Sequence, residues 1–152
     1  MVEEEKSLEP QDDKGRREVN WQAVIPNLNV GQKMQLAMKG PKGARRMLSK
    51  DPNKNIIVSL LKNPRIQIDE VEMIAKSKQS AEEVLREISN NREWMQKYNI
   101  VLALVKNPKT PLPLSLRLLP TLQKRDIGQI AKSKDVANSL KSAAIRKITS
   151  YR

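Results

Sequence analysis

The apolar residues of this chain occur in short blocks with a helical period. From about residue 21, apolar side chains recur every three or four residues, and each block ends at a turn dipeptide. No block alternates with period two for long enough to predict a strand. Proline stands at the junctions, at Pro52, Pro64, Pro108 and Pro111, where it disfavours helix in the preceding residue. The pattern predicts an all-α protein made of a row of short helices.

Two of the expected helices carry start signals. Ser80 and Glu83 form a capping-box pattern before an apolar run, which predicts a helix at about 81–90. Thr110 before Pro111 predicts that another helix begins there, because proline is tolerated in a first helical turn.

Two further helices are expected from apolar spacing. Asn90 and Asn91 can cap a central helix, and Asp135 is expected to cap the last one. One face of the central helix would carry Trp94, Tyr98, Val101, Leu102 and Val105. In the last helix Val136, Leu140, Ala144 and Ile148 recur at every fourth position.

The chain contains an internal repeat. Residues 55–64 align without a gap on residues 99–108, at an offset of 44, and residues 74–78 match residues 130–134, at an offset of 56. Two matches in the same order indicate a duplicated helical unit of roughly 40 to 50 residues, the length range of armadillo and HEAT repeats.

The short sequence motifs that end the expected helices resemble those of a known class of repeat protein. Lys-Asn-Pro at 62–64 and 106–108, Lys-Asp-Pro at 50–52 and the run at 107–111 resemble the bacterial leucine-rich-repeat-variant and HEAT-like α-solenoids, over about residues 40–149. The resemblance implies a short right-handed α-solenoid, of about eight or nine short helices here, used as a binding surface. Some leucine-rich-repeat-variant proteins carry a cysteine-bound iron–sulfur cluster, which a chain without cysteine cannot bind in that way.

Charge divides the chain into two parts. The formal net charge is +12, but residues 1–20 carry −3 and the remainder +15. Residues 1–20 have too few apolar side chains to offset the entropy of ordering, so we expect a disordered acidic tail. It would aid solubility or fold back as a mimic of an anionic ligand. We expect residues 21–152 to form a single basic helical repeat domain, with 21–30 as a cap or linker.

Composition removes most catalytic and metal chemistry. The chain has no cysteine and no histidine. It therefore cannot use a thiolate or an imidazole in catalysis, and it cannot bind zinc through cysteine or histidine ligands. The carboxylates stand in first turns of expected helices, where the helix dipole favours them. We therefore expect no enzyme activity and no cofactor. No apolar run reaches the length of a membrane span, and the acidic start is unlike a signal peptide. These features predict a soluble, cytoplasmic protein.

Lysines flank four of the expected helix junctions. If alternate junctions share one edge of a solenoid, these eight ammonium groups form a ladder suited to nucleic-acid phosphates, anionic lipid head groups or an acidic protein. The helix dipole alone also favours lysine at these positions. The eight residues are Lys50, Lys54, Lys76, Lys78, Lys106, Lys109, Lys132 and Lys134.

The segment 39–46 is a second candidate for anion binding. Its glycines and its cations, among them Lys42, Arg45 and Arg46, precede or open a helix, and helix N-termini attract anions. The spacing of a phosphate-binding Walker loop is absent, so we weigh a docking point for polymeric anions against an ordinary turn.

Aromatic side chains offer one further candidate. Trp94 and Tyr98 are expected in the core. Trp21 precedes the repeats, where it would either cover the first helix or act as an anchor for a partner.

Together these features predict a non-catalytic binding module or scaffold. Its helical surface would engage a protein partner, and its basic edge would select an acidic one. The alternative is a protein that binds nucleic acid without sequence preference, through backbone phosphates. A membrane partner is the weakest of the three, because no helix combines a wide apolar face with aromatic anchors.

Overall fold

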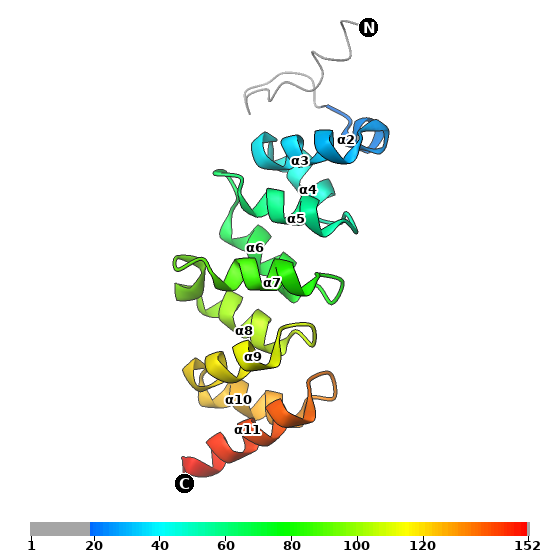
Figure 1. Cartoon of the computed structure of the whole chain (residues 1–152). Coiled ribbons are helices and arrows are strands. Elements are labelled where there is room, and N and C mark those ends of the chain that lie inside the picture. The colour runs from blue at the N-terminus through cyan, green and yellow to red at the C-terminus, as the bar shows by residue number, and fades with distance from the viewer. Residues whose placement is uncertain (1–18, 152) are drawn as a thin grey trace, which may run out of the picture. The chain divides into compact units, whose positions relative to one another are not determined.

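The computed structural model describes residues 19–151, and every regular element in that range is helical (Figure 1). The described residues form ten α-helices and three short 3₁₀ helices, without a strand, so the all-α prediction is confirmed. Residues 1–18 of the expected tail lie outside the described residues. The contacts divide the chain between Gln67 and Ile68 into two compact units, which are described separately. A single domain over 21–152 stays a prediction.

The first unit contains four α-helices and one 3₁₀ helix. Asn29 accepts a hydrogen bond from the backbone N–H of Gln32, whose side chain accepts one from the backbone N–H of Asn29, so a capping box opens the third element. The elements are α2 (Trp21–Val24), η1 (Ile25–Asn27), α3 (Val30–Lys39), α4 (Lys42–Leu48) and α5 (Lys54–Leu61).

The core of the first unit lies between α3, α4 and α5. Helices α3 and α5 pack side by side, and α4 contacts both. Small residues allow these helices to approach one another closely, and two of them, Ala37 and Ala44, are fully buried. Larger apolar side chains fill the remainder, among them Leu48, Ile56 and Leu60.

The second unit contains six α-helices and two 3₁₀ helices. Helix α6 packs on α8, and α10 packs on α11. The elements are α6 (Ile68–Lys76), α7 (Glu82–Ser89), η2 (Trp94–Gln96), α8 (Tyr98–Lys106), α9 (Leu112–Leu118), η3 (Leu119–Thr121), α10 (Lys124–Lys132) and α11 (Asn138–Ser150).

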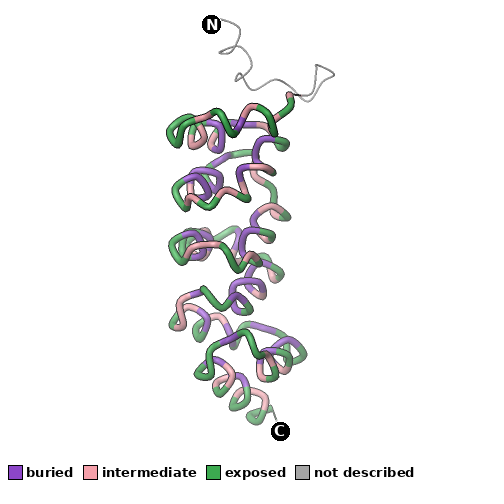
Figure 2. The backbone as a smooth tube through the Cα atoms, turned by 90° about the vertical axis from the view of Figure 1, so that its right-hand side faces the viewer, coloured by how far each residue is buried: buried purple, intermediate pink, exposed green. Residues whose placement is uncertain are grey.

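One apolar cluster joins the last helices of the second unit. The cluster includes Val101 and Val105 of α8 and Ile127 and Ile130 of α10, and α11 adds Leu140 and Ala144 from its apolar residues at every fourth position. Figure 2 shows buried and exposed stretches alternating along the helices, as expected for amphipathic helices. The predicted apolar face of the last helix is therefore confirmed at Leu140 and Ala144.

The sequence repeat corresponds to a repeated set of hydrogen bonds, made by a buried asparagine after each of two helices. Asn63 follows α5, and its side-chain amide donates to the carbonyl oxygens of Ala37 (2.9 Å) and Gly40 (3.1 Å) at the end of α3. Asn107 follows α8, and its side-chain amide donates to the carbonyl oxygens of Ala75 (2.7 Å) and Ser77 (2.9 Å) at the end of α6. Each asparagine is buried and ties the C-terminus of its helix to that of a neighbour within its unit.

Two predicted helix caps are wrong. The hydroxyl of Ser80 does not cap α7, because it donates instead to the carbonyl oxygen of Ile74 (2.7 Å). The hydroxyl of Thr110 likewise donates to the carbonyl oxygen of Leu104 (2.6 Å) and does not cap α9. Both side chains satisfy a carbonyl at the end of the preceding helix, a need that sequence spacing does not reveal.

The predicted central helix and the cap of the last helix also differ from the structure. The chain turns at Lys97, so Trp94 lies in η2 and the α-helix begins at Tyr98. The side-chain oxygen of Asn91 accepts from the backbone N–H of Trp94 (3.0 Å) and supports η2. Asp135 makes no cap, because α11 begins three residues later and Ala137 is its N-cap.

Candidate binding groove

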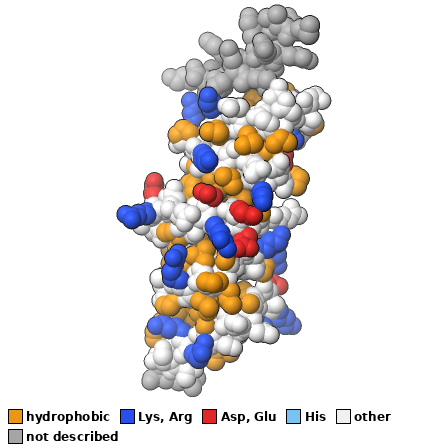
Figure 3. Space-filling model, in the orientation of Figure 1, with side chains coloured by type: hydrophobic (Ala, Val, Ile, Leu, Met, Phe, Trp, Pro, Cys, Tyr) orange, Lys and Arg blue, Asp and Glu red, His pale blue; other side chains and the backbone are white. Residues whose placement is uncertain are grey.

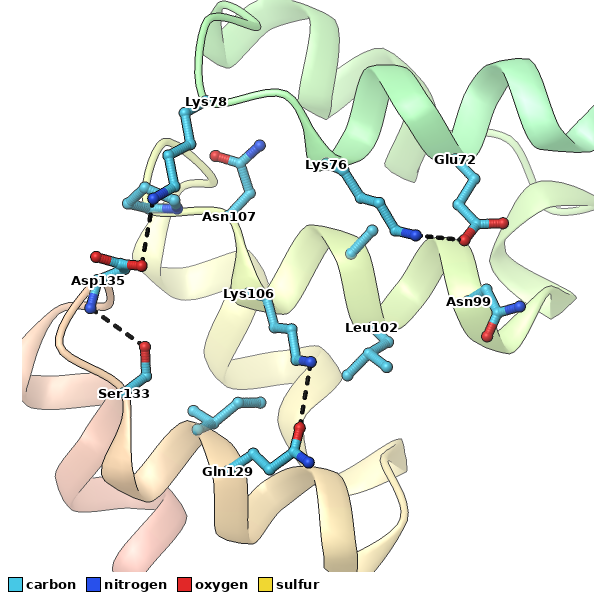
Figure 4. Close-up of a pocket in the computed structure, with 13 residues that line it drawn as sticks. Glu72, Lys76, Lys78, Asn99, Leu102, Lys106, Asn107, Gln129, Ser133 and Asp135 are labelled. Carbon is cyan, nitrogen blue, oxygen red and sulfur yellow. Dashed lines mark hydrogen bonds and ion pairs between the residues drawn. The ribbon is translucent and has the colours of Figure 1, made fainter.

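Three helix junctions of the second unit lie together and enclose a groove of about 490 Å³ (Figure 4). The junctions follow α6, α8 and α10, and each contributes lining residues, among them Lys78, Pro108 and Ser133. The bonds from Asn107 to Ala75 and Ser77 hold the first two junctions side by side. The volume lies in the range of pockets that hold small ligands or peptide side chains.

The groove has an apolar floor and amide groups above it. Leu102, Ala103 and Ile130 line it from α8 and α10. Asn99 and Gln129 add one exposed carboxamide each from the same two helices. A carboxamide both donates and accepts hydrogen bonds, so the pair matches the N–H and C=O groups of a peptide backbone.

The three lysines of the groove have different partners. Lys76 Nζ lies 2.8 Å from a carboxylate oxygen of Glu72, one turn earlier in α6. Lys78 Nζ lies 3.2 Å from Asp135, across the groove mouth. Lys106 Nζ donates to the side-chain oxygen of Gln129 (3.3 Å) and has no carboxylate partner among residues 19–151.

The eight lysines of the predicted ladder are divided between the two units. Within the second unit its six lysines flank the same three junctions, and all six are exposed. Only Lys76, Lys78 and Lys106 line the groove. Lys50 and Lys54 are exposed in the first unit. Anion binding by these lysines stays a prediction, and Lys109, Lys132 and Lys134 stand outside the groove lining.

The amides and the acids of the groove are not among the site residues predicted from the sequence. A signal was present on α8, where Asn99, Leu102, Ala103 and Lys106 follow at i, i+3, i+4 and i+7 and so share one face. The sequence predicts Asp135 as a helix cap. Its contact with Lys78 bridges 57 positions of sequence, so no local pattern predicts it.

The prediction that Arg45 helps to bind an anion in the second candidate site, the segment 39–46, is corrected by the structure. The Arg45 side chain is buried, with 3% of its surface exposed, and Nη1 donates to the carbonyl oxygen of Gly40 (3.1 Å). This carbonyl also accepts from Asn63, so Arg45 belongs to the core of the first unit. Lys42 and Arg46 are exposed on α4, as an anion-binding surface requires.

Trp21 lies against α4. A Cβ atom placed on Gly43 would stand 3.1 Å from Cδ1 and 3.2 Å from Nε1 of the Trp21 ring, so the indole rests on this glycine. The side chain is partly buried. This contact favours the covering role over the role of partner anchor.

Tyr98 and Asp126 form a polar pair inside the second unit. The Tyr98 hydroxyl donates to Asp126, which is buried, and accepts from the backbone N–H of Gln123 (3.0 Å). Burial raises the pKa of Tyr98 above its ordinary value of 10.0, and the hydrogen bond to Asp126 raises it further. The pair joins α8 to the start of α10.

The described residues show two further features that bear on function. Residues 19–151 contain no group of three or more carboxylate, histidine or cysteine side chains that could hold a metal ion. None of the helices in this range has both the length and the apolar character needed to cross a membrane.

Basic side chains dominate the surface of both units. Figure 3 shows Lys and Arg spread over the visible face, whereas the acidic side chains there gather over α6 and α7. Between residues 21 and 67 the sequence has nine basic residues and one acid, Asp51. Asp51 pairs with Lys33 at 3.3 Å.

Comparisons of this chain with protein-family profiles, with curated proteins and with solved structures found no match.

Proposed function

We propose that this protein is a non-catalytic binding module and that its groove binds an extended, acidic segment of a protein partner. We propose further that the helices belong to a short right-handed α-solenoid of the leucine-rich-repeat-variant or HEAT kind. In the second unit the helices α6, α8 and α10 present their C-terminal ends at one edge, which supports this arrangement. The equivalent hydrogen bonds made by Asn63 and Asn107 support it as well.

Lys106 carries the proposal. Its ammonium group lies in the groove, is exposed, and has a neutral amide as its partner, whereas Lys76 and Lys78 are paired with acids. A partner carboxylate can approach Lys106 without breaking an existing ion pair. Such a contact is charge-assisted, and it forms beside the apolar floor, where water is partly excluded.

The groove suits an extended segment rather than a helix or a nucleic acid. Asn99 on α8 and Gln129 on α10 each present a carboxamide that can pair with the backbone N–H or C=O groups of an extended segment. The groove lining carries three lysines and two acids, so its net charge is too small to attract a polyanion by phosphate contacts alone.

The test is a titration with a fluorescein-labelled peptide. The peptide carries Glu at intervals of three residues, separated by Leu and Ser, and fluorescence anisotropy reports binding. We expect a dissociation constant in the micromolar range that rises with salt, because the contact is a screened ion pair. Lys106→Ala should weaken binding about five- to tenfold, the effect of about 1–1.4 kcal/mol.

Lys132→Ala is the matched control. Lys132 ends α10 as Lys106 ends α8, so both substitutions remove a cation from the last helical residue, but Lys132 does not line the groove. We expect Lys132→Ala to change the affinity less than twofold. An equal loss in both variants would show that only the overall charge matters, and the groove would be rejected as the site.

Nucleic-acid binding by the first unit is the second candidate. Residues 21–67 of this unit contain nine basic residues and one acid, and Lys42, Arg46 and Lys50 are exposed. The test is anisotropy with labelled duplex DNA, single-stranded DNA and RNA at about 50 mM and 200 mM salt, a range over which several phosphate contacts cost orders of magnitude in affinity. Lys42→Glu with Arg46→Glu should abolish binding, and Arg45 is left intact because it is buried.

A further inference from the structure

Lys78 and Asp135 form an ion pair at the mouth of the groove. Nζ and Oδ2 are 3.2 Å apart, and the side chains keep 65% and 63% of their surface exposed. Lys78 belongs to the junction after α6 and Asp135 to the junction after α10, so the pair joins the two outer junctions of the groove (Figure 4).

The α6 and α8 junctions are held together without this ion pair, and Asp135 is positioned within its own turn. Asn107 already ties the α8 junction to the α6 junction through two hydrogen bonds, and its side chain is buried. Asp135 is positioned by its own turn, where its backbone N–H donates to the hydroxyl of Ser133 (3.2 Å). An ion pair exposed on both sides contributes little to stability and opens readily.

Asp135 also differs from the other acid in the C-terminal part of the chain. Between residues 94 and 151 the sequence has two acids, Asp126 and Asp135. Asp126 is buried beneath Tyr98. Asp135 is thus the exposed carboxylate of this part of the chain, and it contacts a lysine of the groove.

We propose that Asp135 occupies the place of a partner carboxylate in the free protein. This inference rests on the proposed function of the groove. A partner with two acidic side chains pairs one with Lys106 and the second with Lys78, and the second releases Asp135 to water. The exchange replaces one lysine–carboxylate contact by another, so a second acid on the partner adds little affinity while Asp135 is present.

The groove would therefore distinguish partner segments by their number of acidic side chains. A segment with one acidic side chain binds at Lys106 and leaves the Lys78–Asp135 pair closed. A segment with two acids must compete with Asp135 and therefore gains less than the sum of two free contacts. Removal of the Asp135 charge should make the groove more receptive to two-acid segments in particular.

The experiment compares two labelled peptides that differ by one Glu→Gln change, titrated with the full chain and with Asp135→Asn. We expect Asp135→Asn to tighten binding of the two-acid peptide about two- to fivefold, the range that an exposed ion pair supplies. Binding of the one-acid peptide should change less. In a Lys78→Ala background, Asp135→Asn should have no effect on either peptide, because the contested cation is gone.

Glu82→Gln is the matched control. Glu82 pairs with Arg86 at 2.5 Å in α7, with side chains 52% and 61% exposed, and does not line the groove. The Glu82→Gln substitution removes the same charge as Asp135→Asn, and from an ion pair of the same kind. Equal tightening by Glu82→Gln and Asp135→Asn would overturn the inference, since a general increase in positive charge would explain both.

The outcomes separate this inference from the proposed function. If the full chain binds and Lys106→Ala weakens binding, but Asp135→Asn behaves as Glu82→Gln does, the groove stands and the role of Asp135 is rejected. If neither the full chain nor Asp135→Asn binds either peptide, the proposed function is rejected and this inference with it. Circular dichroism of each variant confirms that it is folded.

Discussion

The side-chain amide of Asn107 donates a 2.7 Å hydrogen bond to the carbonyl oxygen of Ala75, which lies 32 residues earlier at the end of α6. The same amide donates to Ser77, and the Asn107 side-chain oxygen accepts from the backbone N–H of Lys109 (3.0 Å). One buried side chain thus bonds to two carbonyl groups at the end of α6 and to one backbone N–H of its own turn. It also positions the junction that carries Lys106 and the groove.

Asn107→Ala should destabilise the second unit. The substitution removes this donor from the carbonyl oxygens of Ala75 and Ser77, and the loss at Ala75, where the bond is buried, costs about 1–3 kcal/mol. Urea unfolding followed by circular dichroism measures the loss. Asn99→Ala is the control, because Asn99 is exposed, and it should change stability by about 0.5 kcal/mol or less. Equal effects would show that the Asn107 bonds contribute nothing specific.

Arg45 should behave differently from the other cations of α4. Arg45→Ala removes a buried donor to Gly40 and leaves a space in the core of the first unit, so we expect a loss of about 2 kcal/mol or more. Lys42→Ala and Arg46→Ala remove exposed side chains and should each cost about 0.5 kcal/mol or less. Chemical unfolding of the three variants tests this order, and similar losses in all three would contradict the burial of Arg45.

Gly43→Ala should move the indole of Trp21. The new methyl group would lie 3.1 Å from the ring, which is tighter than ordinary contact, so the ring must shift toward water. In a Trp94→Phe background Trp21 is the one remaining tryptophan, and its emission should shift to longer wavelength. Alanine also favours helix over glycine by about 0.5–1 kcal/mol, a gain that displacement of the ring should cancel.

Gly31→Ala is the control for this prediction. Gly31 is the second residue of α3 as Gly43 is the second residue of α4, but its new methyl group would meet only the Asn29 side-chain oxygen, at 3.4 Å. It should therefore keep the helix-propensity gain without moving the Trp21 emission. Identical emission in both variants would show that the indole does not rest on Gly43.

The Tyr98–Asp126 pair predicts a loss of stability at high pH. Burial, and next the bond to Asp126, raises the Tyr98 pKa in the folded protein, so the folded state binds the phenol proton more tightly than the unfolded state. The resulting stabilisation is complete below about pH 10, the unfolded pKa, and is lost as pH rises through the folded pKa.

Tyr98→Phe isolates this contribution from the lysines, which titrate in the same range. Below about pH 10 the variant should be less stable by about 1.5–3 kcal/mol, because a hydrogen bond to a buried carboxylate is lost. The difference from the unsubstituted chain should shrink as pH rises above about 10. Parallel stability curves through pH 10–11 would contradict the raised pKa of Tyr98.

The sequence by itself determined which segments are helical and where they repeat. The period of apolar residues is a local property, and an isolated stretch with that period buries its apolar face only as a helix. The helix at 81–90, the apolar face with Leu140 and Ala144, and the match of 55–64 with 99–108 were all visible in this way, and so was the excess of positive charge.

Tertiary structure alone decided what the polar side chains do. The hydroxyls of Ser80 and Thr110 bond backward to helix ends, Arg45 is buried, and Asp135 contacts Lys78 rather than its own helix. Each outcome depends on which carbonyl, carboxylate or apolar group a packed neighbour brings within hydrogen-bond distance. Such neighbours lie up to 57 residues away in the chain, beyond the reach of any helical period.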